Sequence, residues 1–190
     1  MSYREALWEI AATQHAIVTT RDAEEAAIPA VELRKLARRG ALRHLAHGVY
    51  QHCQVPVTGY TQPAAAVATV GTGAYLDWDA VLSLYDLALV NPATIQVATP
   101  RRFRGKVPPY VRVNSPRSPR PTQELTHHEG IPGLTVHAAL IEAAQRIPHD
   151  RVRAAADTAL ARDLLSPTEH HTLLQLVNSP HDQDERFVLA

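Results

Sequence analysis

The sequence contains one cysteine and no long apolar run, and each absence excludes a class of protein. Cys53 has no second cysteine with which to form an intramolecular disulfide or a cysteine-based zinc site. No apolar stretch approaches the ~18 residues of a membrane span, and the N-terminus lacks the segments of a signal peptide. We therefore expect a cytoplasmic globular protein that makes no contact with a membrane.

Motifs of common enzymes are missing as well. There is no Gly-x-Ser-x-Gly nucleophile elbow and no phosphate-binding loop ending in Gly-Lys-Ser/Thr. The densest histidine clusters, His127-His128-Glu129 and Glu169-His170-His171, lack the His-Glu-x-x-His spacing that places two imidazoles on one helix face. Asp77-Trp78-Asp79 is typical of a helix cap. We expect no catalytic residue, no metal site and no cofactor.

The 19 cations and 19 acids balance over the whole chain, but not along it. Residues 1–32 carry two arginines and six acids, and residues 33–123 carry twelve cations and three acids. Residues 124–190 reverse this, with five arginines and ten acids. The middle of the chain can therefore bind a polyanion, whereas the acidic end should face away from one or toward another protein.

Local signals between Ile17 and Gln51 predict two short helices followed by a hairpin. The signals are Thr19 or Thr20 as the cap of a helix over residues 21–27, Pro29 in the first turn of a helix over residues 29–39, Gly40 just after that helix, and a hairpin of residues 42–45 and 49–51 turning at Ala46-His47-Gly48. This order indicates a winged helix-turn-helix that binds duplex DNA.

The second of these helices separates into two faces at about 100° per residue. Ala30, Leu33, Leu36 and Ala37 form an apolar face, while Val31, Arg34, Lys35 and Arg38 form a cationic one with Arg39 and Glu32 at its margin. A cationic face alone is usually a solvated face, but here it belongs to the second helix of the unit. The predicted DNA-binding residues are Thr20, Arg21, Ala30, Val31, Arg34, Lys35, Arg38, Arg39, Arg43 and His47.

A supporting first helix is predicted upstream. Ser2-Tyr3-Arg4-Glu5 has the spacing of a capping box, and Tyr3, Leu7, Ile10 and Ala11 then recur on one helix face. Trp8 lies elsewhere on this helix, where it belongs either to the core, the interpretation we favour, or to a dimer contact. The first domain then spans residues 1–54, and residues 55–59 read as a linker.

A mixed second domain is predicted over residues 55–190. Its expected elements are a helix over residues 64–70 stopped by Gly71-Thr72-Gly73, a helix over 78–87 capped by Asp77, strands over 94–99, 107–113 and 124–129, a turn at 130–133, and helices over 137–147, 151–161 with Asp150 as cap, and 167–177 opened by Ser166. Residues 183–190 form a polar tail ending in an apolar quartet. The chain is thus α+β, a winged helix-turn-helix followed by a mixed α/β domain ending in helices.

A basic loop joins two of the expected strands. Arg101, Arg102, Arg104 and Lys106 surround Phe103, and Arg112, Arg117 and Arg120 follow without an intervening acid. A solvated hairpin is the alternative interpretation. We favour secondary contacts of Arg101, Arg102, Arg104 and Lys106 with DNA phosphates, because a DNA-reading unit precedes them.

Several motifs together resemble the AbiEi-type antitoxin and transcriptional-regulator family of type IV toxin–antitoxin systems. They are Ala12-x-x-x-Ala-Ile-Val-Thr-Thr-Arg-Asp-Ala, Leu33-x-x-Leu-x-x-x-Gly-x-Leu42, Gly48-Val-Tyr50, residues 80–87, residues 95–106, Gly130-Ile-Pro132 and Leu140-Ile-Glu-Ala143. The resemblance covers most of the chain and is most specific in its front half. His137-Ala138-Ala139 departs from the Arg-Thr pair with which the last of these helices commonly begins in the family.

The resemblance implies a winged domain that represses its own operon at operator DNA in its promoter and self-associates there. It also implies an antitoxin domain over residues 55–190 that counteracts a nucleotidyltransferase-like toxin without forming a stable complex. One alternative is a stand-alone winged-helix transcription factor whose second domain binds a ligand or oligomerises. A more remote one is a nuclease-like enzyme that uses the carboxylates of the second domain.

Overall fold

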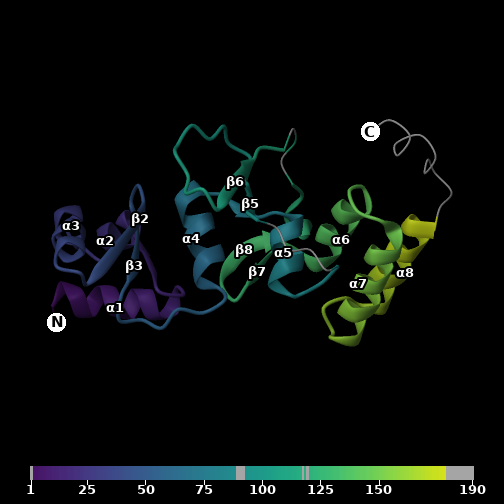
Figure 1. Cartoon of the computed structure of the whole chain (residues 1–190), viewed down its shortest axis with the longest axis horizontal. Coiled ribbons are helices and arrows are strands. Elements are labelled where there is room, and N and C mark those ends of the chain that lie inside the picture. Colours follow the sequence, from purple (N-terminus) through teal and green to yellow (C-terminus); the bar gives the residue numbers. More distant parts are fainter. Residues whose placement is uncertain (1, 89–92, 117, 119, 179–190) are drawn as a thin grey trace.

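A computed structural model of the protein describes residues 2–88, 93–116, 118 and 120–178 (Figure 1). The first part of the chain forms α1 (Tyr3–Thr13), β1 (Ile17–Thr19), α2 (Thr20–Glu25), α3 (Ala30–Arg38), β2 (Leu42–Ala46) and β3 (Val49–His52). The second part forms α4 (Thr61–Val70), β4 (Tyr75–Leu76), α5 (Trp78–Leu84), β5 (Ile95–Ala98), β6 (Val111–Asn114), η1 (Thr122–Glu124), β7 (Leu125–His128), β8 (Ile131–Leu134), α6 (Val136–Ala144), α7 (His149–Ala161) and α8 (Pro167–Asn178). The predicted α+β class is confirmed.

The first sheet is antiparallel, in the order β1-β3-β2, and the three N-terminal helices pack against it. Its core consists of buried apolar side chains from all of these elements: Leu7, Ala11, Ala16, Val18, Ala23, Ile28, Leu33, Leu42, Tyr50 and Val55. Ser2 and Glu5 form the predicted capping box at the start of α1. Trp8 is 45% exposed, so the expectation that it belongs to the core was wrong.

The second sheet has the order β6-β5-β4-β8-β7 and mixes both kinds of pairing. β4 is antiparallel to β5 and parallel to β8, while β5 and β6 are parallel. The segment between β5 and β6 is therefore a crossover and not a hairpin turn. β6 lies at the sheet edge, as Pro108 and Pro109 predict.

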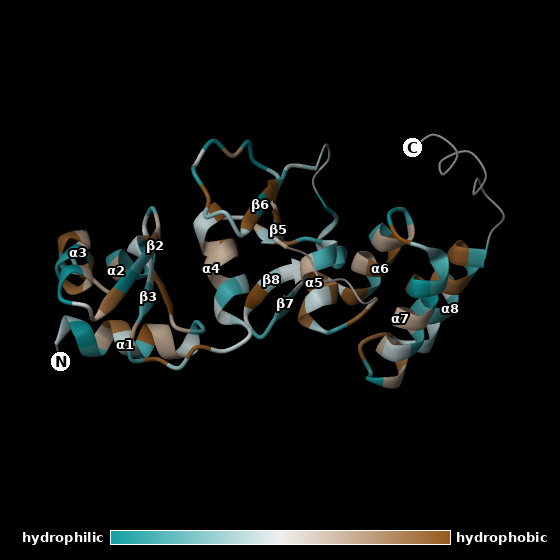
Figure 2. Ribbon diagram, viewed as in Figure 1, coloured by the Kyte–Doolittle hydropathy of each residue, from teal (hydrophilic) through white to brown (hydrophobic). Residues whose placement is uncertain are grey.

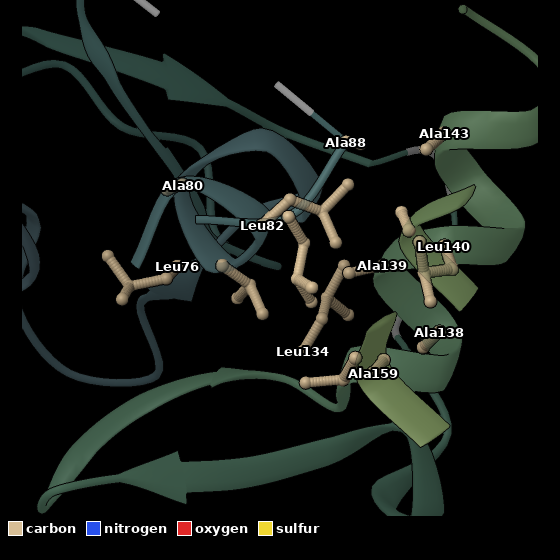
Figure 3. Close-up of a cluster of buried hydrophobic side chains, with 14 of the residues drawn as sticks. Leu76, Ala80, Leu82, Ala88, Leu134, Ala138, Ala139, Leu140, Ala143 and Ala159 are labelled. Carbon is tan, nitrogen blue, oxygen red and sulfur yellow. The ribbon is translucent and has the colours of Figure 1, made fainter. Parts of the chain in front are cut away.

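Helices α5 and α6 cover the second sheet and share its apolar core. Figure 3 shows Leu82 of α5, Leu134 of β8 and Ala139 of α6 converging on one another. The small residues along α6 and α7 allow the helices to approach closely, because each contributes little beyond its Cβ. Leu173 and Val177 of α8 complete this core from the C-terminal side.

Helix α4 lies between the two sheets, in contact with β1 and β3 on one side and with β4, β5 and β8 on the other (Figure 1). On the first side, Ile17, Ala46 and Val49 pack against Ala65 in a separate apolar cluster. A hydrogen bond also joins the two parts of the chain directly, since His15 Nε2 donates over 2.7 Å to the Glu129 carbonyl in the turn after β7. The division after residue 54 remains a prediction, and Val55 packs in the N-terminal core.

Several expected boundaries in the second part were wrong. β8 occupies residues expected to form a turn, and the turn falls at Glu129-Gly130, both at positive φ. Helix α5 ends at Leu84, and β6 begins only at Val111, after the two prolines. Pro148 takes the N-cap position of α7, so Asp150 lies inside the first turn and is not its cap. The expected tail over residues 183–190 lies outside the described residues.

No helix in the described ranges has the length and apolar character that crossing a bilayer requires.

Candidate nucleic-acid interface

Helix α3 owes its limits to residues at both ends. Pro29, at φ −61°, is the N-cap residue, so α3 begins at Ala30, one residue later than expected. At the other end Gly40, at φ +77°, donates its N–H to Ala37, and Ala41 donates to Leu36. These two bonds form a Schellman motif, which requires a left-handed residue where Gly40 stands. The chain therefore leaves α3 sharply and enters β2.

The two predicted faces of α3 are separated in the structure. Leu33 is fully buried, with Ala30, Leu36 and Ala37 partly buried beside it. Val31, Arg34, Lys35, Arg38 and Arg39 are exposed. Lys35 Nζ lies 2.7 Å from Glu32 Oε1, so this acid is neutralised by its neighbour. Among the described residues, no ion pair involves Arg34, Arg38 or Arg39, which leaves these guanidinium groups available to phosphates or base edges.

The hairpin of β2 and β3 projects beside α3 and forms the wing (Figure 1). Ala46 pairs with Val49, so His47 and Gly48 form the turn, with Gly48 at φ +70°. His47 at the tip and Arg43 on β2 are exposed. The hairpin therefore exposes Arg43 and His47, together with His44 on the same strand, beside α3.

Helix α2 connects the wing to the second part of the chain. Thr19 caps it in a capping box with Asp22. The main-chain N–H of Thr20 donates to the Gly48 carbonyl at the wing tip. Arg21 pairs with Glu25, and its Nη1 also donates to Thr72 Oγ1 over 3.4 Å. Thr72 lies in the turn after α4, and its role as a neighbour of Arg21 had no signal in the sequence.

The basic loop begins next to that turn. A Cβ on Gly73 would lie 3.9 Å from the ring of Pro100. The side chains of Arg101, Arg102, Arg104 and Lys106 are exposed, and Phe103 folds back over Gly105. In Figure 2 the segment between β5 and β6 is hydrophilic over most of its length. It extends toward the same edge of the molecule as the wing tip (Figure 1).

Both ends of the basic loop are held by hydrogen bonds. At the start of the loop, the Thr99 N–H donates to the Asn114 carbonyl at the far end of β6. At the end of the loop, the Ile95 N–H donates to the Tyr110 carbonyl just before β6. Asn114 Nδ2 donates to Asp77 Oδ2 over 2.9 Å, which holds β6 against the start of α5. Arg120 does not join the free cations of the loop, because it pairs with Glu124 and Glu142. Arg117 lies outside the described residues.

The carboxylates of Asp77 and Asp79 are buried at the start of α5, each 4% exposed. Asp77 accepts from the Trp78 N–H, which confirms the predicted cap. Asp79 accepts from the Ala80 N–H and from Gln96 Nε2, and burial raises the pKa of its carboxyl. Both carboxylates thus have hydrogen-bond partners within the fold, which gives each a structural role.

The histidine clusters disperse in the fold. His128 is buried and bonded to Tyr85 and to the Leu134 carbonyl, while His127 beside it is exposed. His170 bonds to Asp157 across α7 and α8. Among the described residues, no three His, Cys, Asp or Glu side chains gather closely enough to hold a metal ion.

Three helices, an antiparallel sheet and a projecting hairpin define a winged helix-turn-helix, a class of DNA-binding domain. Residues 5–51 match the model of a family described as "Transcriptional regulator, AbiEi antitoxin". The match confirms, over these residues, the resemblance found in the sequence, and its description supports a DNA-binding antitoxin.

The fold is also similar to that of the RV2827C protein from Mycobacterium tuberculosis, known from a crystal structure. The two share 20% sequence identity with a TM-score of 0.51, over 90% of this chain and 70% of that one. A similarity at this level of identity is one of fold. The comparison with curated proteins gave no match.

Proposed function

We propose that this protein is a DNA-binding antitoxin that represses its own type IV toxin–antitoxin operon. The observation that carries the proposal is the exposed face of α3 inside a winged helix-turn-helix. On this face Val31 is exposed, and Arg34 and Arg38 have no ion-pair partner among the described residues. In this class the second helix of the motif lies in the major groove. Arginines can then read guanine edges, and Val31 can contact a thymine methyl.

Flanking residues would position the duplex without reading it. We call Val31, Arg34 and Arg38 the reading face of α3. The predicted residues around it are Lys35 and Arg39 on α3, Ala30 at the start of α3, Arg43 and His47 on the hairpin, and Thr20 and Arg21 at the start of α2. Arg101, Arg102, Arg104 and Lys106 extend the cationic surface onto the second part of the chain. Contacts of these loop cations with phosphates would add affinity that does not depend on sequence.

The acidic C-terminal region carries the second function in this proposal. After residue 123 the chain has ten acids and five arginines, which would repel phosphates. Helices α6, α7 and α8 therefore stay away from DNA and counteract a nucleotidyltransferase-like toxin. The antagonism acts on the target or the effects of the toxin, without a stable complex of the two proteins.

A footprint on the promoter of the protein's own operon tests the first function. Protection of defined sites by the wild-type chain, together with lower expression of a reporter from that promoter, is the expected result. The length of the footprint also reports how many copies bind side by side. Equal affinity for promoter DNA and random DNA would contradict specific autorepression.

Growth of cells expressing the adjacent toxin tests the second function. Co-expression of this chain should restore growth, while affinity capture of either protein should recover little of the other. Repression without any rescue of growth would favour a stand-alone transcription factor. A stable complex would contradict the type IV mechanism.

A further inference from the structure

A hollow of about 590 Å³ lies between the start of α1 and the end of α3, on the winged domain. Its lining comes from three separate segments of the chain: Ser2, Tyr3 and Arg4; Glu32, Leu36, Arg39, Gly40 and Ala41; and Gln54. Arg4 lies within the capping-box segment at the start of α1 but is not among the predicted DNA-binding residues. The hollow brings it to the same cavity as Arg39, although the two are far apart in the sequence.

Neither arginine of the hollow has a counter-ion in a described ion pair. Elsewhere in the fold, paired arginines are held in place: Arg120 contacts two glutamates, and Arg146 lies 2.5 Å from Glu142. Two arginines that line one cavity without a counter-ion leave positive charge uncompensated there. The cavity therefore favours a negatively charged occupant.

The acids around the hollow are already bound to other groups. Glu32 lines it, but its carboxylate lies 2.7 Å from Lys35 Nζ. Glu5 accepts from the Ser2 N–H as part of the capping box. His52 is fully buried nearby, and its burial, followed by the charge of Arg4, lowers its pKa. His52 therefore stays neutral at pH 7 and does not add to the charge of the site.

The position of the hollow on α3 relates it to the reading face. At about 100° per residue, Glu32, Leu36 and Arg39 form a stripe that adjoins the face of Val31, Arg34, Lys35 and Arg38. A helix in the major groove has a sugar–phosphate wall on each side. A group in the hollow would lie where α3 meets one of these walls.

We propose that Arg4 and Arg39 form an oxyanion site that takes a backbone phosphate of the bound duplex. The proposal rests on the DNA-binding function proposed above and adds Arg4 to it. Each guanidinium presents two parallel N–H donors to phosphate oxygens, a geometry that a lysine lacks. Gln54 and Tyr3, which line the same hollow, carry an amide and a hydroxyl that can act as neutral donors. This contact positions α3 without reading sequence.

The first test measures the salt dependence of DNA binding by Arg4→Gln, Arg39→Gln and the double variant. Each single change should weaken operator and random DNA alike and lower the slope of log K against log salt by about 0.9. Arg151→Gln, an exposed change on α7, is the matched control and should leave the slope unchanged. An unchanged slope in Arg4→Gln, with a normal circular-dichroism spectrum, overturns the proposal.

A second measurement separates this site from DNA binding as a whole. Inorganic phosphate is titrated without DNA, while the Nε–Hε signals of Arg4 and Arg39 are followed by NMR. If the wild-type chain binds no DNA, the proposed function fails, and the titration still decides whether the site binds an oxyanion. Shifts of both signals support the site. Shifts combined with an unchanged salt slope would assign the hollow to a small free anion and overturn the backbone-phosphate assignment.

Discussion

The main-chain N–H of Thr20 donates to the carbonyl of Gly48 over 2.9 Å, and a Cβ on Gly48 would stand 2.8 Å from the Thr20 hydroxyl. The wing tip is thus held against the start of α2, at a residue whose φ of +70° suits glycine. The position of the wing depends on this contact as well as on the strand pairing.

Gly48→Ala should therefore lower the free energy of unfolding by about 1–2 kcal/mol and weaken DNA binding, because the left-handed conformation is strained and the Cβ displaces Thr20. Gly59→Ala is the control, since Gly59 has open space around it and no positive φ. Denaturant unfolding and DNA affinity are measured for both variants. Equal behaviour of the two would show that the wing tolerates displacement.

Arg34→Ala and Arg38→Ala should each weaken operator binding by roughly 1–3 kcal/mol, the contribution of a good base contact. Both side chains are exposed, so the free energy of unfolding should stay within about 0.5 kcal/mol of the wild type. Fluorescence anisotropy with operator and scrambled duplexes separates the two effects. If both variants bind the operator with wild-type affinity, α3 is not the helix that reads the DNA sequence.

Neutralising Arg101, Arg102 and Arg104 together should weaken operator and random DNA equally. The salt slope should fall by about 0.9 for each phosphate contact that is lost. Because main-chain hydrogen bonds hold the loop at Thr99 and at Tyr110, the variant should keep its fold. A salt slope identical to that of the wild type would show that the loop makes no contact with DNA phosphates.

His128 should make the stability of the protein depend on pH. Its Nε2–H donates to the Leu134 carbonyl, and in the neutral ring Nδ1 accepts from the Tyr85 hydroxyl. Burial lowers the pKa of His128 below its ordinary value. Its contribution to stability is then complete above the unfolded pKa, about 6.5, and is lost as the pH falls through the lower folded pKa.

His128→Gln should accordingly be less stable than the wild type at pH 7.5 by about 1–3 kcal/mol and should show a smaller loss of stability on acidification. His127→Gln changes the exposed neighbour on the same strand and should alter the pH profile much less, because burial is the largest cause of the His128 pKa shift and the charge of His127 the smallest. Urea unfolding between pH 5 and pH 7.5 tests both. His52 shifts in the same direction, so some pH dependence should persist.

Separation of the two parts is the fifth prediction. A fragment of residues 1–58 keeps Val55 in the N-terminal core and should bind operator DNA more weakly than the full chain, without protecting cells from the toxin. The weaker binding follows from loss of the basic loop and from exposure of Ile17, Ala46 and Val49, which pack on Ala65. Growth assays with each part co-expressed with the toxin test this prediction. Protection by the N-terminal fragment alone would contradict the assignment of the two functions to separate parts of the chain.

Features with local causes were predictable from the sequence. Thr19, Gly40 and Gly48 act through their own caps and turns, so the helix-turn-helix and the hairpin were found within a residue or two. The two faces of α3 follow from periodicity alone. The exposed cations of the predicted interface were therefore placed correctly, whereas their contacts with DNA stay predictions.

Features that depend on distant partners were not predictable. β1 has only three residues and exists because β3 pairs with it. Pro132 and Gly133 indicate a turn by local rules, yet they lie in β8, where the His128 ring fills the space beside Gly133. The proximity of Arg4 and Arg39 likewise arises from packing and has no counterpart in a local motif.

The contact of Ala65 with the first sheet gives the molecule a fixed internal spacing. Since alanine has no atom beyond Cβ, α4 lies flat against Ile17, Ala46 and Val49, which fixes the position of α4 on the first sheet. The distance between α3 and the basic loop is therefore set by the fold. If α3 and the basic loop both contact phosphates, the distance between the two contacts is set by the packing of α4. A bent duplex and a straight duplex of the same sequence would then bind with different affinity.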